Sequence, residues 1–204
     1  MFLSVFEMFK VGIGPSSSHT MGPMVAAARF LDKMRAEPFH YAGLRGALHG
    51  SLAFTGVGHA SDRATILGLA GFRPETYDAE AAEAVLAQIR DTHTIAPPDL
   101  PVLTFHPKDD LVFDFGPNLP GHANGMVLMA TDAQGDVILR ETYYSIGGGF
   151  VMTEDELAAG RNTQEGDPVP YPFKSAAQML DMAERSGKTI AEMKRANEIS
   201  RGGA

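Results

Sequence analysis

Three short loops that combine glycine, histidine and hydroxyl or amide side chains interrupt the apolar segments of this chain. They are Gly14–Thr20 (GPSSSHT), Thr55–Asp62 (TGVGHASD) and Asn118–Gly125 (NLPGHANG). The first loop leads into an expected helix, and free N–H groups at a helix N-terminus favour an anion such as a carboxylate or phosphate. Serine and threonine hydroxyls there either cap the helix or bind the ligand. A fold that brings the three loops together could hold one small charged molecule.

Periodic apolar residues predict helices on both sides of the second loop. The first helix starts within residues 20–23, where proline is tolerated, and stops before Pro38. Ser61 is the expected N-cap of a second helix that ends at Gly71, and Asp78 opens a third. The residues that the first helix is expected to bury are Ala27, Phe30, Leu31 and Met34.

Alternating and short apolar runs predict strands in the middle of the chain. One run feeds the glycine turn of the second loop, and two others flank TDAQGD, which has the turn residues of a hairpin. We therefore expect an antiparallel or mixed sheet, and a fold of the α+β class in which helices are layered on the sheet. The expected strands cover residues 44–54, 102–106, 111–115, 126–130 and 137–142.

The C-terminal quarter has a different pattern. Residues 153–172 lose periodicity and collect glycine and proline, which predicts a long surface connection. Two helices should follow, the second opening at Thr189 with the spacing of a capping box. The first of them is expected to bury one face made of Ala176, Met179, Leu180 and Ala183.

Five separated motifs together resemble the iron–sulfur L-serine dehydratases of bacteria. Their order and spacing are similar to the amino-terminal, or beta, domain of the single-chain enzyme, and the resemblance covers essentially the whole chain. The motifs are Lys10–Thr20, Gly58–Asp62, Asn118–Gly125, Tyr143–Phe150 and Pro170–Ser175.

The resemblance implies a division of labour between two domains. Residues 1–155 would be the beta domain, and residues 156–204 a linker and helices leading toward a second, alpha domain. In that family the cysteines that hold a 4Fe-4S cluster lie in the alpha domain, and this chain has no cysteine. The cluster would therefore belong to the complete enzyme, with none of its ligands in this chain. The resemblance also implies similarity to the anion-binding, or allosteric-substrate-binding, domain of some phosphoglycerate dehydrogenases.

The implied reaction is L-serine ammonia-lyase chemistry in amino-acid degradation and gluconeogenesis. Water is eliminated from L-serine, and pyruvate and ammonia form after tautomerisation and hydrolysis, with a cluster iron acting as Lewis acid on the hydroxyl. A histidine suits the proton transfer because its pKa lies near neutral pH, and His59 is our candidate base. This chain alone should be inactive. The expected substrate-binding residues are Ser16, Ser17, Ser18, His19, Thr20, Ser61, His122 and Asn124.

Parts of the sequence also bear on a hydrolase, on a zinc site and on a regulatory module. A Ser–His hydrolase needs an oriented pair and an acidic partner, and the adjacent Ser18 and His19 should point apart unless a turn intervenes. A zinc site is not expected, because no paired histidine or carboxylate spacing occurs. The main rival is a regulatory module that binds serine or another anion at Ser16–Thr20 and contributes no catalytic group.

Charge and hydropathy restrict the partners. A net charge of −8 and a pI near 5.3 argue against nucleic acid or anionic membrane, which bind clustered Lys and Arg. No apolar stretch approaches the roughly 20 residues that span a bilayer, and the first ten residues do not resemble a signal peptide. We expect a cytoplasmic protein that binds L-serine and a cluster-bearing alpha domain or subunit; its oligomeric state, a homodimer included, stays open.

Overall fold

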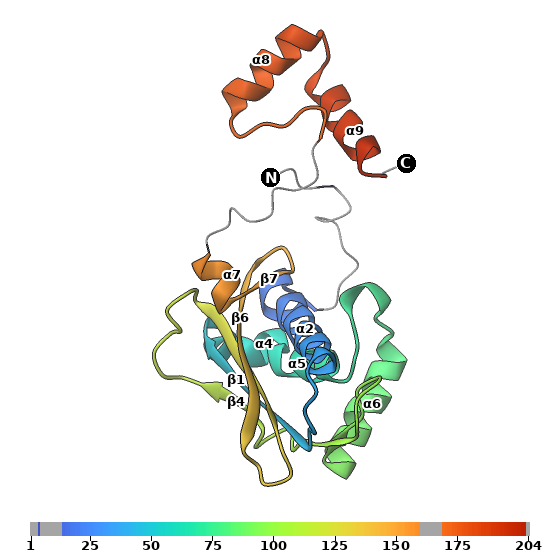
Figure 1. Cartoon of the computed structure of the whole chain (residues 1–204), viewed down its shortest axis with the longest axis vertical. Helices are drawn as coiled ribbons and strands as arrows, with labels where there is room; N and C mark the ends of the chain where they lie inside the picture. Colours follow the sequence, from blue (N-terminus) through green and yellow to red (C-terminus); the bar gives the residue numbers. More distant parts are fainter. Residues whose placement is uncertain (1–3, 5–13, 160–168, 203–204) are drawn as a thin grey trace. The chain divides into compact units, whose positions relative to one another are not determined.

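The structure is a computed structural model that describes residues 4, 14–159 and 169–202 (Figure 1). The chain divides into two compact units, residues 11–158 and residues 1–10 with 159–204. The larger unit holds the sheet and the three histidine loops. Part of the expected connection at 153–172, residues 160–168, lies outside the described residues.

The described residues of the larger unit form a mixed sheet of seven strands. The strand order is β2-β3-β1-β5-β6-β7, and β4 pairs with β1 beside β3. β1 runs parallel to β3 and β4, and the other pairs are antiparallel. The predicted α+β class with a mixed sheet is confirmed. The strands are β1 (Gly43–Gly50), β2 (Thr94–Ile95), β3 (Leu103–Thr104), β4 (Leu111–Asp114), β5 (Asn124–Thr131), β6 (Val137–Gly147) and β7 (Phe150–Thr153).

The central strand β1 ends earlier than the sequence predicts. Residues 51–54 were expected to be strand but form the short helix α3 (Ser51–Phe54), and a second short helix, α4 (Gly56–His59), replaces the expected turn. Gly50 turns the chain between them with φ 56° and ψ −129°, a conformation that suits glycine. Periodicity could not show this change, because a short apolar run fits a strand or a buried helix equally well.

Helix α2 (Gly22–Ala36) packs against α5 (Ser61–Leu69) and against β6 (Figure 1). Its four expected core residues are buried, and it ends before Pro38 as predicted. The two helices approach closely at Gly68, where an added Cβ would lie 2.4 Å from the carbonyl oxygen of Met24. The core therefore lies between these helices and the sheet.

The predicted start of α2 within residues 20–23 is confirmed, whereas the N-cap of α5 differs from the prediction. A π-helical turn, η1 (Ser17–Met21), precedes α2, and Ser16 caps it by accepting a hydrogen bond from the N–H of His19 at 3.2 Å. Ser61 is the first residue of α5 and not its N-cap, a position taken by Ala60 in the left-handed conformation. The expected capping role of Ser61 is therefore wrong, since its hydroxyl bonds to another loop.

The next helix and the predicted hairpin are confirmed. The carboxylate of Asp78 accepts the N–H of Ala81 at 2.7 Å and caps α6 (Ala79–Thr92) after the short η2 (Pro74–Thr76). β5 and β6 pair around the predicted turn. Strand β7 was not predicted; β6 reverses into it through Gly147–Gly149, which all have positive φ. A short helix, α7 (Glu154–Ala158), occupies the start of the expected surface connection.

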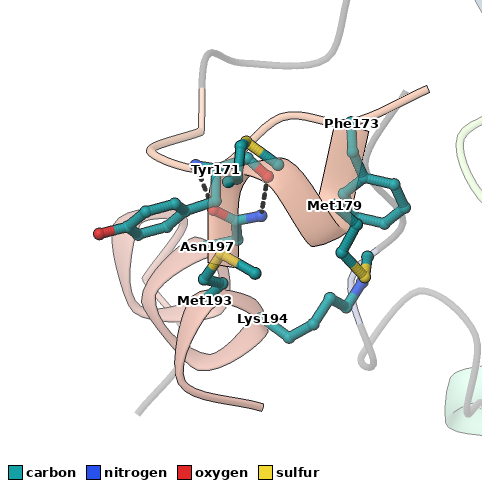
Figure 2. A pocket seen from close by; sticks show the side chains of 7 residues that line it. Tyr171, Phe173, Met179, Met193, Lys194 and Asn197 are labelled. Atoms are coloured by element: carbon teal, nitrogen blue, oxygen red, sulfur yellow. Dashed lines mark hydrogen bonds between the residues drawn. The ribbon is translucent and has the colours of Figure 1, made fainter. Parts of the chain in front are cut away.

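The smaller unit contains the two predicted C-terminal helices, α8 (Ala176–Ser186) and α9 (Ile190–Ser200). The side-chain amide of Asn197 pairs with the backbone of Tyr171 through two hydrogen bonds of 2.8 Å, and the side chains of Phe173, Met179 and Met193 lie around them (Figure 2). The capping box at Thr189 is confirmed. The predicted buried face of α8 is wrong, because none of its residues is buried.

Candidate active site

The first two histidine loops meet at the rings of His19 and His59, whose centroids are 4.9 Å apart. Two hydrogen bonds join the loop backbones. The hydroxyl of Thr20 donates to the carbonyl of His59 at 2.9 Å, and the hydroxyl of Ser61 donates to the carbonyl of His19 at 2.5 Å. Both hydroxyl side chains are buried. These two reciprocal bonds, called the histidine clasp below, hold loops that are about forty residues apart in one corner of the domain.

Both ring nitrogens of His19 lie near serine hydroxyls. Nδ1 is 2.9 Å from the hydroxyl of Ser18, and Nε2 is 2.8 Å from the hydroxyl of Ser51 at the start of α3. Ser18 and His19 were expected to point apart unless a turn intervened, and the π-helical turn does intervene and brings them together. Among the described residues, no carboxylate orients the ring through its other nitrogen, as the triad of a serine hydrolase requires. The arrangement fits ligand binding better than hydrolysis.

The proton position on His59 follows from its backbone contact. Nδ1 lies 2.9 Å from the carbonyl oxygen of Thr55, and a carbonyl can only accept a hydrogen bond. Nδ1 must therefore carry the hydrogen, and the neutral ring keeps its lone pair on Nε2. The side chain is half-buried. A histidine in this tautomer can take a proton at Nε2.

The third loop joins the same corner through the backbone. The N–H of Ser51 donates to the carbonyl of Ala123 at 2.8 Å, next to His122 in sequence. The N–H of Asn124 donates to Nδ1 of His122 at 3.1 Å, so neutral His122 carries its hydrogen on Nε2 and can donate there. Ser51 thus contacts both the ring of His19 and the third loop.

Asn124 also fixes the third loop to strand β6. Its side-chain amide donates to the carbonyl of Ser145 at 3.1 Å. The N–H of Gly121 donates to the buried hydroxyl of Tyr144 at 3.3 Å. Both contacts come from the end of β6, which carries the fourth motif, so this motif positions the loop of His122.

Comparison with known proteins agrees with these motifs. A family model described as "Serine dehydratase beta chain" matches residues 4–156.

The chain belongs to this family.

Its relatives include L-serine dehydratases of Streptomyces coelicolor (42% identical, over 97% of this chain and 44% of the relative) and Helicobacter pylori (40%, over 96% and 43%). The L-serine dehydratase 1 of Escherichia coli is 37% identical over 97% of this chain and 43% of its own length. The chain thus spans less than half the length of the curated relatives it matches.

Within this serine dehydratase beta chain, the described residues contain no group of three or more His, Cys, Asp or Glu side chains that could hold a metal ion. The whole sequence has no cysteine. The donor set of a 4Fe-4S cluster is four thiolates in most proteins, so the residues of this chain do not fit that cofactor. Among the described helices, none has the length and apolar character that a membrane crossing requires.

Sequence reasoning missed three contributors to this corner. Ser51 was assigned to a strand, although it supplies the hydroxyl on His19. Thr55 fixes the tautomer of His59 through a carbonyl, which no side-chain pattern can show. Ser145 is buried, and its hydroxyl has no hydrogen-bond partner within the described chain; an added Cβ on Gly22 would lie 2.0 Å from it. The sequence signal for the close approach of Ser145 to α2 was Gly22, the residue before Pro23.

The pKa of His19 is lowered, mainly by burial and also by the neighbouring His59, whose charge would repel a second one. We expect His59→Gln to raise the pKa of His19 while leaving it below the ordinary value of about 6.5, because burial remains. Titration of the imidazole C–H signals by NMR would measure the pKa of His19 in the wild-type chain and in the variant. An unchanged pKa of His19 in the variant would contradict the electrostatic coupling.

The same lowered pKa makes stability depend on pH. The pKa of His19 is about 6.5 in the unfolded chain and lower in the folded chain. As the pH falls below about 6.5, the unfolded chain therefore binds a proton at His19 before the folded chain does, and acid favours unfolding. This stabilising contribution is complete above that value and is lost as the pH falls toward the lower pKa of the folded state. His19→Gln, which cannot titrate, should weaken the loss between pH 7.5 and 5.5 in urea unfolding.

Proposed function

We propose that this chain is the substrate-orienting and proton-transfer half of a cytoplasmic L-serine dehydratase, which converts L-serine into pyruvate and ammonia. The observation that carries the proposal is the pair of His19 and His59 at 4.9 Å, with the Nε2 of His59 in the proton-accepting state. The relatives are L-serine dehydratases more than twice as long as the matched segment, so the remaining machinery would come from an alpha domain or subunit.

In the proposed reaction, His59 takes the α-proton of serine at Nε2. The electrons of that C–H bond form the Cα–Cβ double bond, and the Cβ–O bond breaks with departure of hydroxide. The resulting aminoacrylate tautomerises to an imine, which water hydrolyses to pyruvate and ammonia. General base catalysis by a positioned histidine supplies about 10²–10⁴-fold of rate enhancement.

The hydroxyl loop would bind the substrate carboxylate. Within the described chain, the N–H groups of Ser17 and Ser18 at the start of η1 have no hydrogen-bond partner, and Ser16 and Ser18 place hydroxyls beside them. Such N–H groups favour an anion. Neutral His19, with its lowered pKa, would act by hydrogen bonding and not by charge.

His122 and Asn124 would orient the substrate from the third loop, His122 as an N–H donor at Nε2. Thr20 and Ser61 are buried with their hydroxyls on backbone carbonyls, so we assign them to holding the loops and not to substrate contact. The 4Fe-4S cluster of the complete enzyme would be bound entirely by the partner, since this chain offers no thiolate.

Reconstitution tests the proposal. This chain would be co-expressed with the part of the Streptomyces coelicolor relative that it does not match, iron and sulfide would be reconstituted without oxygen, and pyruvate formation from L-serine would be measured. We expect turnover only when both components are present. Turnover by the partner alone, or a stable complex without turnover that still binds serine, would replace the proposal with a regulatory anion-binding module. Threonine as a parallel substrate would show the selectivity.

A further inference from the structure

An exposed apolar surface borders the histidine corner. Phe54 of α3 and Phe115 after β4 are 64% and 60% exposed, and their rings meet edge to face with centroids 5.3 Å apart. Phe113 stacks against Phe115 from the core side at 6.5 Å. Val57 of α4 is 77% exposed and follows Gly56, where an added Cβ would lie 2.5 Å from the Phe113 ring. These four side chains form the aromatic face.

Most of the aromatic face lies in segments without charged residues; the exception is Phe113, which is followed by Asp114 in β4. The sequence contains no Asp, Glu, Lys or Arg between Arg45 and Asp62, or between Asp114 and Asp132, although charged residues make up 21% of the chain. Depletion of charge together with enrichment in aromatic residues distinguishes the centre of a protein interface from ordinary surface. Contiguous exposed aromatic side chains at such a place mark an interaction site.

The aromatic face is continuous with the candidate active site. Phe54 precedes Thr55, whose carbonyl fixes the proton on His59, and Val57 lies two residues before His59. The same short helices therefore carry the apolar side chains and the candidate base. A body seated on the aromatic face would lie against the short helices α3 and α4, the second of which carries His59.

We infer that the aromatic face is the docking surface for the cluster-bearing part of the dehydratase, a partner that presents an apolar patch of its own. The identity of this partner rests on the proposed function. More than half of each curated relative lies outside the matched segment and belongs to the same polypeptide, so the two parts are covalently joined there and an interface between them would be permanent. Permanent interfaces are more hydrophobic than transient ones, which fits an uncharged aromatic centre.

Paired substitutions test the inference. Phe54→Ser with Phe115→Ser removes both exposed rings, whereas Phe39→Ser removes a ring of similar exposure (44%). Phe39 precedes β1 and Phe54 follows it, and the strand itself spans about 23 Å from Gly43 to Gly50 at 3.3 Å per residue. Dissociation constants for the unmatched part of the Streptomyces coelicolor relative, loaded with its cluster without oxygen, would be measured by sedimentation. We expect at least about 30-fold weaker binding for the double variant, which is the loss of a single aromatic anchor worth about 2 kcal/mol, and no change for Phe39→Ser.

Hydrogen exchange of the complex provides a second measurement that does not depend on substitution, and residues 51–58 and 113–117 should be protected by the partner. Unchanged affinity of a folded double variant, or no binding of the wild-type chain to the cluster-loaded partner, would overturn the inference. A third result would also overturn it: the wild-type chain self-associates, the double variant is a monomer, and binding to the partner is unchanged. In that case the occupant of the aromatic face would be a second copy of this chain. Binding through the aromatic face without pyruvate formation would instead uphold the docking surface and overturn the proposed function.

Discussion

His59→Ala in the reconstituted two-part enzyme should lower kcat by about 10²–10⁴-fold with little change in KM. The variant keeps the clasp, because Thr20 bonds to the backbone carbonyl of residue 59 and not to the ring. It removes the Nε2 lone pair that the Thr55 contact leaves free. Steady-state pyruvate formation, followed together with the melting temperature of the chain, separates the loss of chemistry from a loss of folding.

The pH profile sharpens this prediction. A general base works only when unprotonated, so activity of the wild-type enzyme should fall on the acid side, and the residual activity of His59→Ala should lack that limb. His40→Ala is the matched control, because His40 lies exposed in the loop before β1. Near-normal turnover of His59→Ala would refute the assignment and place the base in the partner.

Gly50→Ala should lower the free energy of unfolding of this chain by about 2–6 kcal/mol. The alanine would have to adopt φ 56° and ψ −129°, which costs about 1–3 kcal/mol, and its Cβ would lie 2.4 Å from the Ala123 carbonyl oxygen. Overpacking of that kind adds about 1–3 kcal/mol. Because the obstacle is backbone, relief requires movement of the third loop away from Ser51.

Urea unfolding followed by far-UV circular dichroism would measure the effect. Gly58→Ala is the matched control: Gly58 lies in α4, its φ is not positive, and no atom lies within 4 Å of an added Cβ. That change should be neutral or stabilise the chain by up to about 1 kcal/mol. Equal stability of the two variants would show that the close approach at Gly50 does not constrain the loop.

The sequence was most informative where one element decides its own structure. The carboxylate of Asp78 caps α6 by a local contact, and Pro38 stops α2 whatever lies around it. At α3 the outcome depended on Gly50 meeting a loop more than seventy residues away. At α8 the amphipathic pattern correctly predicted a helix with one apolar face, but it could not show whether another element packs on that face, and Leu180 is 61% exposed.

The candidate site shows the same division. The shared composition of the three loops allowed them to converge on one pocket; in the structure the rings of His19 and His59 meet, and the third loop joins them through the backbone of Ser51. The proton on His59 could not be predicted, since it depends on a carbonyl that every residue possesses. The role of Ser51 depends on where a strand ends, which is the least certain feature of any sequence prediction.

The hydrogen bonds of the histidine clasp do not involve Nε2 of His59, the nitrogen that can bind a proton. Both bonds of the clasp use hydroxyl donors and backbone acceptors that do not titrate near neutral pH. The bond from Nδ1 of His59 to Thr55 also persists in both protonation states, because Nδ1 carries its hydrogen in each. Under the proposed function, a proton would arrive at Nε2 and leave again while the frame around the ring stays unchanged, so each turnover would begin from the same geometry without any rearrangement of the loops.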